Sequence, residues 1–89
     1  MKRIIETETK QELEVYLDQQ LFIFCGIYHY TGTLIAINDN FLILKNPYIV
    51  YETGAWQNKS WNDCQKLPTN ELCIRLNSIE SYFITKVIP

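Results

Sequence analysis

The sequence predicts an all-β protein, a strongly bent five-stranded small barrel that follows an N-terminal α-helix. Several short apolar runs have the length of strands, and at 72–77 apolar residues alternate with a mixed set, which is the period of a strand with one buried face. Most of these runs are separated by a few turn-forming residues, as in hairpins. At 89 residues the chain is expected to form a single domain, residues 1–89.

A capping box predicts where the helix begins. The hydroxyl of Thr9 and the carboxylate of Glu12 can each accept a hydrogen bond from a backbone amide of the first turn. The residues that follow at helical spacing are Leu13, Tyr16, Leu17 and Gln20. This pattern predicts a short amphipathic helix at about 10–19.

Five apolar runs are predicted to form the strands. Gly32 lies inside the second run, and a glycine inside a strand indicates a sharp bend or close packing of the backbone. Asn46-Pro47 interrupts the third run and predicts a bend, a bulge or an edge, because proline has no N–H to donate. The predicted strands are 21–25, 28–37, 41–51, 71–77 and 80–87.

The segment 52–70 shows neither strand nor helix periodicity and is predicted to be a long loop. As a surface loop it is expected to be dispensable for the fold. It carries Trp56 and Trp61, two large aromatic residues in polar surroundings, which are expected to pack onto the barrel or to contact a protein partner. The alternative fold, an OB-type barrel, would place a helix here, and the lack of helical periodicity ranks it second.

Composition argues against several classes of function. The net charge of −2 is not that of a duplex-DNA binder. Cys25, Cys64 and Cys73 form no CxxC pair, and His29 is the only histidine, so neither a disulfide framework nor a metal site is expected. No catalytic constellation or phosphate-cradling loop appears, so we expect no enzyme and no cofactor. The short apolar runs and the lack of a signal-peptide pattern predict a cytoplasmic protein without membrane spans.

Two segments resemble the motifs of the Sm/LSm/Hfq superfamily. The first motif is a strand with an internal glycine, an acidic turn and an apolar strand, and it corresponds to Gly32-Thr-Leu-Ile-Ala-Ile-Asn-Asp-Asn-Phe-Leu-Ile-Leu44. The bacterial Hfq branch aligns without a gap through Lys45-Asn46. The second motif, Ile-Arg-Gly followed by two polar residues and Ile, corresponds to Ile74-Arg75-Leu76-Asn77-Ser78-Ile79. The resemblance covers about 10–51 and 71–87.

This resemblance implies an Sm-like homo-oligomeric ring of about five to seven subunits. The apolar last two strands agree with it, because their unpaired edges would invite pairing with another copy. In the family, a base of single-stranded RNA inserts at the inner rim between a side chain of the turn after the second strand and the arginine of the second motif. The implied RNA, U- or A-rich, would be bound by Asn38, Asp39, Asn40, Phe41, Arg75 and Asn77.

The alignment leaves two positions open. The acidic residue of the turn corresponds to Asn38 without a gap, or to Asp39 if the turn is one residue longer. The base-stacking position is then Asn40 or Phe41. Ordinary hairpin chemistry would also explain the polar turn, and a salt bridge would also explain Arg75.

Other positions depart from the family pattern. Leu76 stands where the family has glycine, and the asparagine that hydrogen-bonds a base falls on Leu42 or Ile43. The Lys-His pair of the Hfq branch is absent. The alternative hypothesis is therefore a ring-shaped scaffold that binds protein through 52–70 and has no RNA activity.

Overall fold

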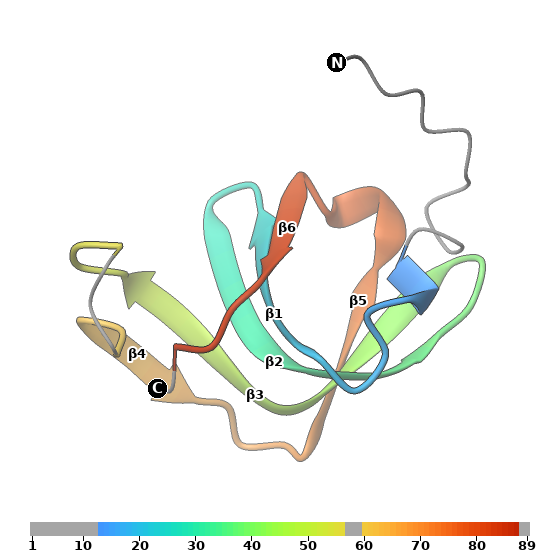
Figure 1. The fold of residues 1–89 in the computed structure, drawn as a ribbon, viewed down its shortest axis with the longest axis horizontal. Coiled ribbons are helices and arrows are strands. Elements are labelled where there is room, and N and C mark those ends of the chain that lie inside the picture. Colours follow the sequence, from blue (N-terminus) through green and yellow to red (C-terminus); the bar gives the residue numbers. More distant parts are fainter. Residues whose placement is uncertain (1–12, 57–59, 88–89) are drawn as a thin grey trace.

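The computed structural model describes residues 13–56 and 60–87, which form one strongly bent antiparallel sheet of six strands (Figure 1). The strand order is β4-β3-β2-β1-β6, and β5 pairs with the other part of β3. The elements are β1 (Gln20–Cys25), β2 (Tyr28–Ile37), β3 (Phe41–Glu52), β4 (Asp63–Lys66), β5 (Glu71–Arg75), the 3₁₀-helix η1 (Leu76–Ser78) and β6 (Ser81–Ile84).

The long strand β3 organises the sheet, because two successive strands pair along its length. Its first part pairs with β5, where Lys45 is opposite Glu71, and its last part pairs with β4, where Tyr48 is opposite Lys66. β4 and β5 therefore act as one returning strand that is interrupted at residues 67–70.

The prediction that 52–70 is a loop is wrong for part of this segment. β3 continues to Glu52, residues 63–66 form β4, and Trp61 is only 7% exposed. β4 reads Asp-Cys-Gln-Lys and has little apolar alternation of its own, so its pairing with β3 determines its structure. The predicted five strands therefore become six. The next strand also ends earlier than predicted, at Arg75, because the chain turns into η1.

The predicted helix at about 10–19 begins outside the described residues. Its described part is a single turn, in which the N–H of Tyr16 donates to the carbonyl of Leu13 at 2.9 Å. Asp18 then adopts a left-handed backbone conformation with φ of 68° and donates its N–H to the carbonyl of Leu34 at 2.7 Å. This bond ends the turn and directs the chain into β1. The described residues contain no helix long and apolar enough to cross a membrane.

Gly32 is required where β2 and β3 approach each other most closely. A β-carbon at this position would lie 3.0 Å from Cβ of Leu44 and 3.1 Å from the carbonyl oxygen of Lys45. The predicted close backbone packing is confirmed. Opposite Gly32, β3 contains one extra residue: Thr31 pairs with Tyr48 and Thr33 with Lys45, which leaves Asn46-Pro47 as a β-bulge.

Two hydrophobic clusters lie on opposite faces of β1. Leu21 and Ile23 contribute to one cluster, and Phe22 and Phe24 to the other, which explains why this run is continuously apolar. The barrel core consists of Leu13, Leu21, Ile23, Leu34, Leu42, Leu44 and Ile74. The aromatic cluster consists of Phe22, Val50 and Trp61 with the surrounding Phe24, His29, Cys64, Val87, Trp56 and Phe83.

Candidate nucleic-acid interface

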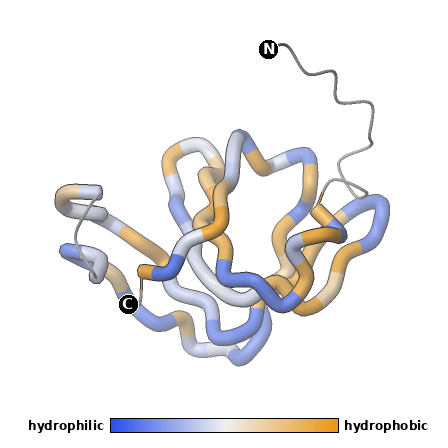
Figure 2. Tube along the Cα trace, viewed as in Figure 1, coloured by the Kyte–Doolittle hydropathy of each residue, from blue (hydrophilic) through white to orange (hydrophobic). Residues whose placement is uncertain are grey.

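The turn between β2 and β3 is closed by internal hydrogen bonds and is solvent-exposed. Oδ1 of Asn38 accepts hydrogen bonds from the N–H groups of Asn40 at 2.8 Å and Phe41 at 2.9 Å, and the N–H of Asn38 donates to the carbonyl of Phe41 at 3.0 Å. The turn is the hydrophilic tip at the right of Figure 2. The Asn38 side chain is therefore occupied in shaping the turn. These bonds set the backbone positions of Asn40 and Phe41.

Arg75 lies beside this turn although it is distant in the sequence. Phe41 pairs with Arg75 where β3 meets β5, and the N–H of Leu76 donates to the carbonyl of Asn40 at 2.9 Å. The backbone of one Sm-like motif is thus hydrogen-bonded to the backbone of the other. The structure brings together the segments that carry all the sequence-predicted site residues.

The side chains of Phe41 and Arg75 share the sheet face opposite to the barrel core. Their neighbours Leu42 and Ile74 are buried in that core, and successive residues of a strand point to opposite faces. Arg75 is exposed and Phe41 is half-buried. Arg75 is therefore the cross-strand neighbour of an aromatic residue, on the same sheet face and beside the turn.

Two further polar residues lie on the segments that the backbone contact between Leu76 and Asn40 joins. Asn40 on the turn, Arg75 at the end of β5 and Asn77 in η1 are all exposed. A guanidinium offers a planar face for stacking, and an amide offers both a donor and an acceptor to the edge of a base. The arrangement can hold a flat, polar group such as a nucleobase.

Burial separates the two positions that could replace the family's asparagine. Leu42 is fully buried in the barrel core, so no side chain at this position could reach a base at the surface. Ile43 is half-buried on the face of Arg75, and its aliphatic side chain has no group that could hydrogen-bond a base. Leu76 is half-buried and packs against the same core, so its side chain points away from solvent.

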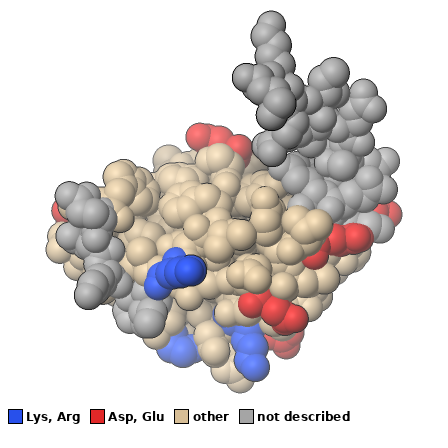
Figure 3. All heavy atoms as spheres, in the orientation of Figure 1, with Lys and Arg blue, Asp and Glu red and all other residues tan. Residues whose placement is uncertain are grey.

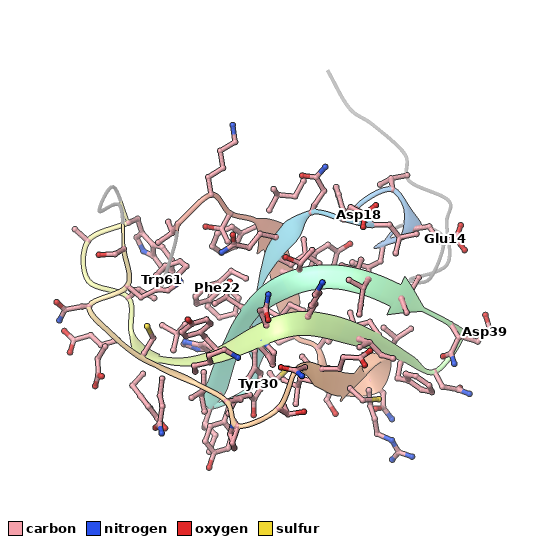
Figure 4. All side chains as sticks on the ribbon, turned by 90° about the horizontal axis from the view of Figure 1, so that it is seen from below. Glu14, Asp18, Phe22, Tyr30, Asp39 and Trp61 are labelled. Atoms are coloured by element: carbon pink, nitrogen blue, oxygen red, sulfur yellow. The ribbon has the colours of Figure 1, made fainter. Side chains whose placement is uncertain are left out.

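Acidic groups lie near this end of the molecule. In the view of Figure 3, Asp and Glu gather mainly on the right, the side of the β2–β3 turn in Figure 1, and Lys and Arg lie toward the lower left. Figure 4 shows Asp39 at the tip of this turn, at the opposite end of the sheet from Phe22 and Trp61. The acidic groups on this side would repel phosphates, so contacts with bases would have to supply much of the affinity.

The sequence-based site omits two residues. Ile43 pairs with Cys73, and both lie on the same face as Phe41 and Arg75. Alternation in each strand indicates their face, but only the register between β3 and β5 places them beside the arginine. Cys73 is an exposed free thiol.

The titratable groups with shifted pKa values lie away from this site, at the other end of β2. Burial raises the pKa of the Cys25 thiol, and burial, with a smaller contribution from the charge of Asp63, raises the pKa of Cys64. Burial is also the main cause of the raised pKa of Tyr30. These groups stay protonated at neutral pH. Among the described residues, no three His, Cys, Asp or Glu side chains gather to hold a metal ion.

No family model and no curated protein sequence matches the chain. Among solved structures, the chain is similar to the Pyrococcus abyssii Sm protein in complex with a uridine heptamer. The TM-score is 0.59 at 13% sequence identity, and the similarity covers 89% of this chain and 100% of that chain. The fold is therefore Sm-like, as the two motifs predicted.

Proposed function

We propose that this Sm-like protein forms a homo-oligomeric ring of about five to seven subunits that binds U- or A-rich single-stranded RNA at its inner rim. The observation that carries the proposal is the contact between the turn at 38–40 and the segment 75–77. The hydrogen bond from Leu76 to Asn40 holds the exposed Arg75 beside the turn. The uridine heptamer bound to the Pyrococcus protein supports the same ligand class.

The sheet edges support assembly into a ring. In the described part of the chain, β5 pairs only with β3 and β6 only with β1, so each strand has a free edge. Exposed edges favour pairing with another chain. Pairing β5 of one subunit with β6 of the next is a head-to-tail contact that closes by rotation. Phe83 and Ile84 of β6 are partly exposed and would be covered in such a contact.

Base stacking would supply most of the affinity. A base stacked on the Arg75 guanidinium, with Asn40 or Phe41 on its other side, gains roughly 1–3 kcal/mol. Asn77 would hydrogen-bond the edge of the base. One such site is weak, and repetition around the ring adds avidity. With eight Lys and Arg against ten Asp and Glu, few phosphates are neutralised, so the salt dependence is mild.

Fluorescence polarisation with labelled oligo-U and oligo-A at low salt tests the RNA site. Arg75→Ala should weaken binding about tenfold or more, since it removes the stacking contact. Arg75→Lys keeps the charge but not the planar group and should also weaken it. Lys86→Ala removes an exposed charge outside the site and serves as the control. Unchanged binding by Arg75→Ala, or no binding by the wild type, would contradict the RNA function.

Light scattering after gel filtration tests the ring. The wild type and Arg75→Ala should both have the mass of a closed oligomer, because Arg75 is exposed and lies outside both hydrophobic clusters. A stable monomer at micromolar concentration would contradict the ring and the avidity that depends on it.

The second candidate function is a protein-binding ring scaffold. Trp56 is 58% exposed and lies on the aromatic cluster, where its ring centroid is 6.0 Å from that of Phe83. An exposed tryptophan beside other aromatic rings is typical of a protein-binding surface. If the oligonucleotide titrations show no binding while the ring is intact, the protein-binding scaffold replaces RNA binding as the proposed function.

A further inference from the structure

A polar groove lies on the sheet face opposite to the barrel core, away from the β2–β3 turn. Its volume is about 440 Å³. The residues that line it are Gln20, Thr31, Gly32, Thr33, Lys45, Asn46, Tyr48 and Lys66. The strand register explains why they meet: Thr31, Tyr48 and Lys66 are successive cross-strand partners on β2, β3 and β4, and Thr33 is opposite Lys45.

The β-bulge opens this groove. Asn46 and Pro47 together oppose Gly32, so Lys45 and Tyr48 are one residue further apart along β3 than Thr33 and Thr31 are along β2. Asn46 has a left-handed backbone with φ of 51°, and its N–H donates to the carbonyl of Asn70 at 3.0 Å. Gly32 adds no side chain to the floor. The hollow thus lies where a bulge in β3 faces a glycine in β2.

The charged residues that line the groove are both basic, although the net charge of the chain is negative. Lys45 and Lys66 both line it, and none of the described lining residues is acidic. Glu71 is the cross-strand partner of Lys45 but does not line the groove. Two ammonium groups on one hollow repel each other, and an anion between them would relieve that repulsion.

Hydrogen-bond donors complete the groove. Thr31 is 1% exposed, and its Oγ1 accepts a hydrogen bond from Nε2 of Gln20 at 3.5 Å. Its own hydroxyl hydrogen is therefore left to donate. Nε2 of Gln20 also donates to the carbonyl of Val87 at 2.6 Å, and these two hydrogen bonds orient the Gln20 side chain at the side of the groove. Thr33 and Tyr48 add two further hydroxyl groups.

We propose that this groove, between Lys45 and Lys66 on the face opposite to the barrel core, binds a phosphate group. Phosphate oxygens accept several hydrogen bonds, and charge-assisted bonds from ammonium groups are stronger than neutral ones. The phosphate belongs either to a small phosphomonoester or to the backbone of an RNA strand that passes over this face. The site is separate from Arg75 and does not depend on base stacking there.

Amide chemical shifts of ¹⁵N-labelled protein test the site. Inorganic phosphate, uridine 5′-monophosphate, uridine and oligo-U are titrated at constant ionic strength. Phosphate-bearing probes should shift the amides of Thr31, Thr33, Lys45 and Asn46, and uridine should not. Lys45→Gln and Lys66→Gln should each weaken this response about tenfold, whereas Lys86→Gln, also a loss of one exposed lysine, should leave it unchanged.

The probes separate the two sources of phosphate. A lysine-dependent response to phosphate and the monophosphate assigns a small phosphomonoester, and a response to oligo-U alone assigns an RNA backbone. In the second case, each lysine substitution should also reduce the slope of log affinity against log salt by about 0.7. Arg75→Ala should keep the groove response, which separates this site from the proposed base site.

Two results would overturn the proposal. One is that no phosphate-bearing probe shifts the groove amides. The other is that the shifts persist unchanged in Lys45→Gln and Lys66→Gln. Thr33→Val, which removes one hydroxyl at a half-buried position with little change in volume, provides a further variant if a lysine substitution impairs folding.

Discussion

The barrel core and the aromatic cluster lie on opposite faces of the same strand but differ in how completely they are sealed. The barrel core is aliphatic, and nearly all its members are fully buried. In the aromatic cluster the ring centroid of Phe22 lies 4.7 Å from that of Trp61. Phe22 also stacks on Phe83, with 5.2 Å between their ring centroids. Its outer members stay partly exposed, with Phe83 at 38% and Trp56 at 58%. Side chains that alternate between the two faces of β1 thus contribute to one fully buried core and to one cluster that is only partly covered.

The two clusters also differ in what supplies them. The barrel core comes from β1, β2, β3 and β5, with Leu13 from the preceding turn. The aromatic cluster depends on Trp61, which precedes β4, and on Val87 near the C-terminus. A segment without periodicity can therefore contribute to stability when one large side chain from it is buried.

The largest effect is expected at Trp61. Trp61→Ala should lower the free energy of unfolding by about 3–5 kcal/mol, because it removes a buried ring and leaves a cavity. Urea denaturation measures the loss. Trp61→Phe is the matched control and should cost less, since it keeps a ring and removes a buried N–H that has no acceptor in the described part of the chain. A loss below about 1 kcal/mol for Trp61→Ala would show that the aromatic cluster is not a core.

The next effect tests the barrel core. Gly32→Ala should cost about 1–3 kcal/mol, because the new β-carbon would meet Cβ of Leu44 and the backbone of Lys45. Gly26→Ala is a useful contrast, since no atom lies within 4 Å of its β-carbon and only the φ of +68° opposes it. Its cost should be about 1 kcal/mol. Equal losses for both variants would argue against close packing at Gly32.

A smaller effect is expected at the exposed side of the aromatic cluster. Trp56→Ala should change the free energy of unfolding by less than about 1 kcal/mol, because the side chain is more than half exposed. The same urea titration measures it beside Trp61→Ala. A cost as large as that of Trp61→Ala would mean that Trp56 completes the core.

The last prediction concerns the rates at which the three cysteine thiols react with a thiol reagent, and it involves no change in the stability of the fold. Cys73 is exposed and should react first with a thiol reagent at pH 8. Cys25 and Cys64 should react slowly, because burial raises their pKa values and the thiolate is the reactive form. Their rates should rise only at more alkaline pH. Mass spectrometry of the labelled peptides reads out the order, and early labelling of Cys25 would contradict its burial.

The sequence predicted the features that depend on local chemistry. Short apolar runs located β1, β2 and the first part of β3. Gly32 predicted a bend or close packing, and the structure shows close packing. Asn46-Pro47 predicted a bend, a bulge or an edge, and the structure shows a bulge. The two motifs predicted the Sm-like fold, which the similar solved structure confirms.

Features that depend on register were not predictable from the sequence. β4 is too polar to show a strand period, and only its pairing with β3 defines it. The burial of Trp61 follows from that pairing. Likewise, the polar groove is lined by Lys45 on β3 and Lys66 on β4, and the spacing of these two lysines in the sequence does not predict that they lie close together. The turn and Arg75 were predicted to meet only because the motifs suggested it, and the link through Leu76 became visible in the structure.

The length dependence of oligo-U binding tests the central claim most directly, namely that Arg75 and the adjacent turn form one base site that is repeated around a ring. Fluorescence polarisation compares oligonucleotides of two or three bases with ones long enough to circle the pore. We expect the short ones barely to bind, the long ones to bind measurably through avidity, and Arg75→Ala to lose this difference while the ring stays assembled. Binding that does not depend on length, or a length dependence that Arg75→Ala retains, would contradict the account.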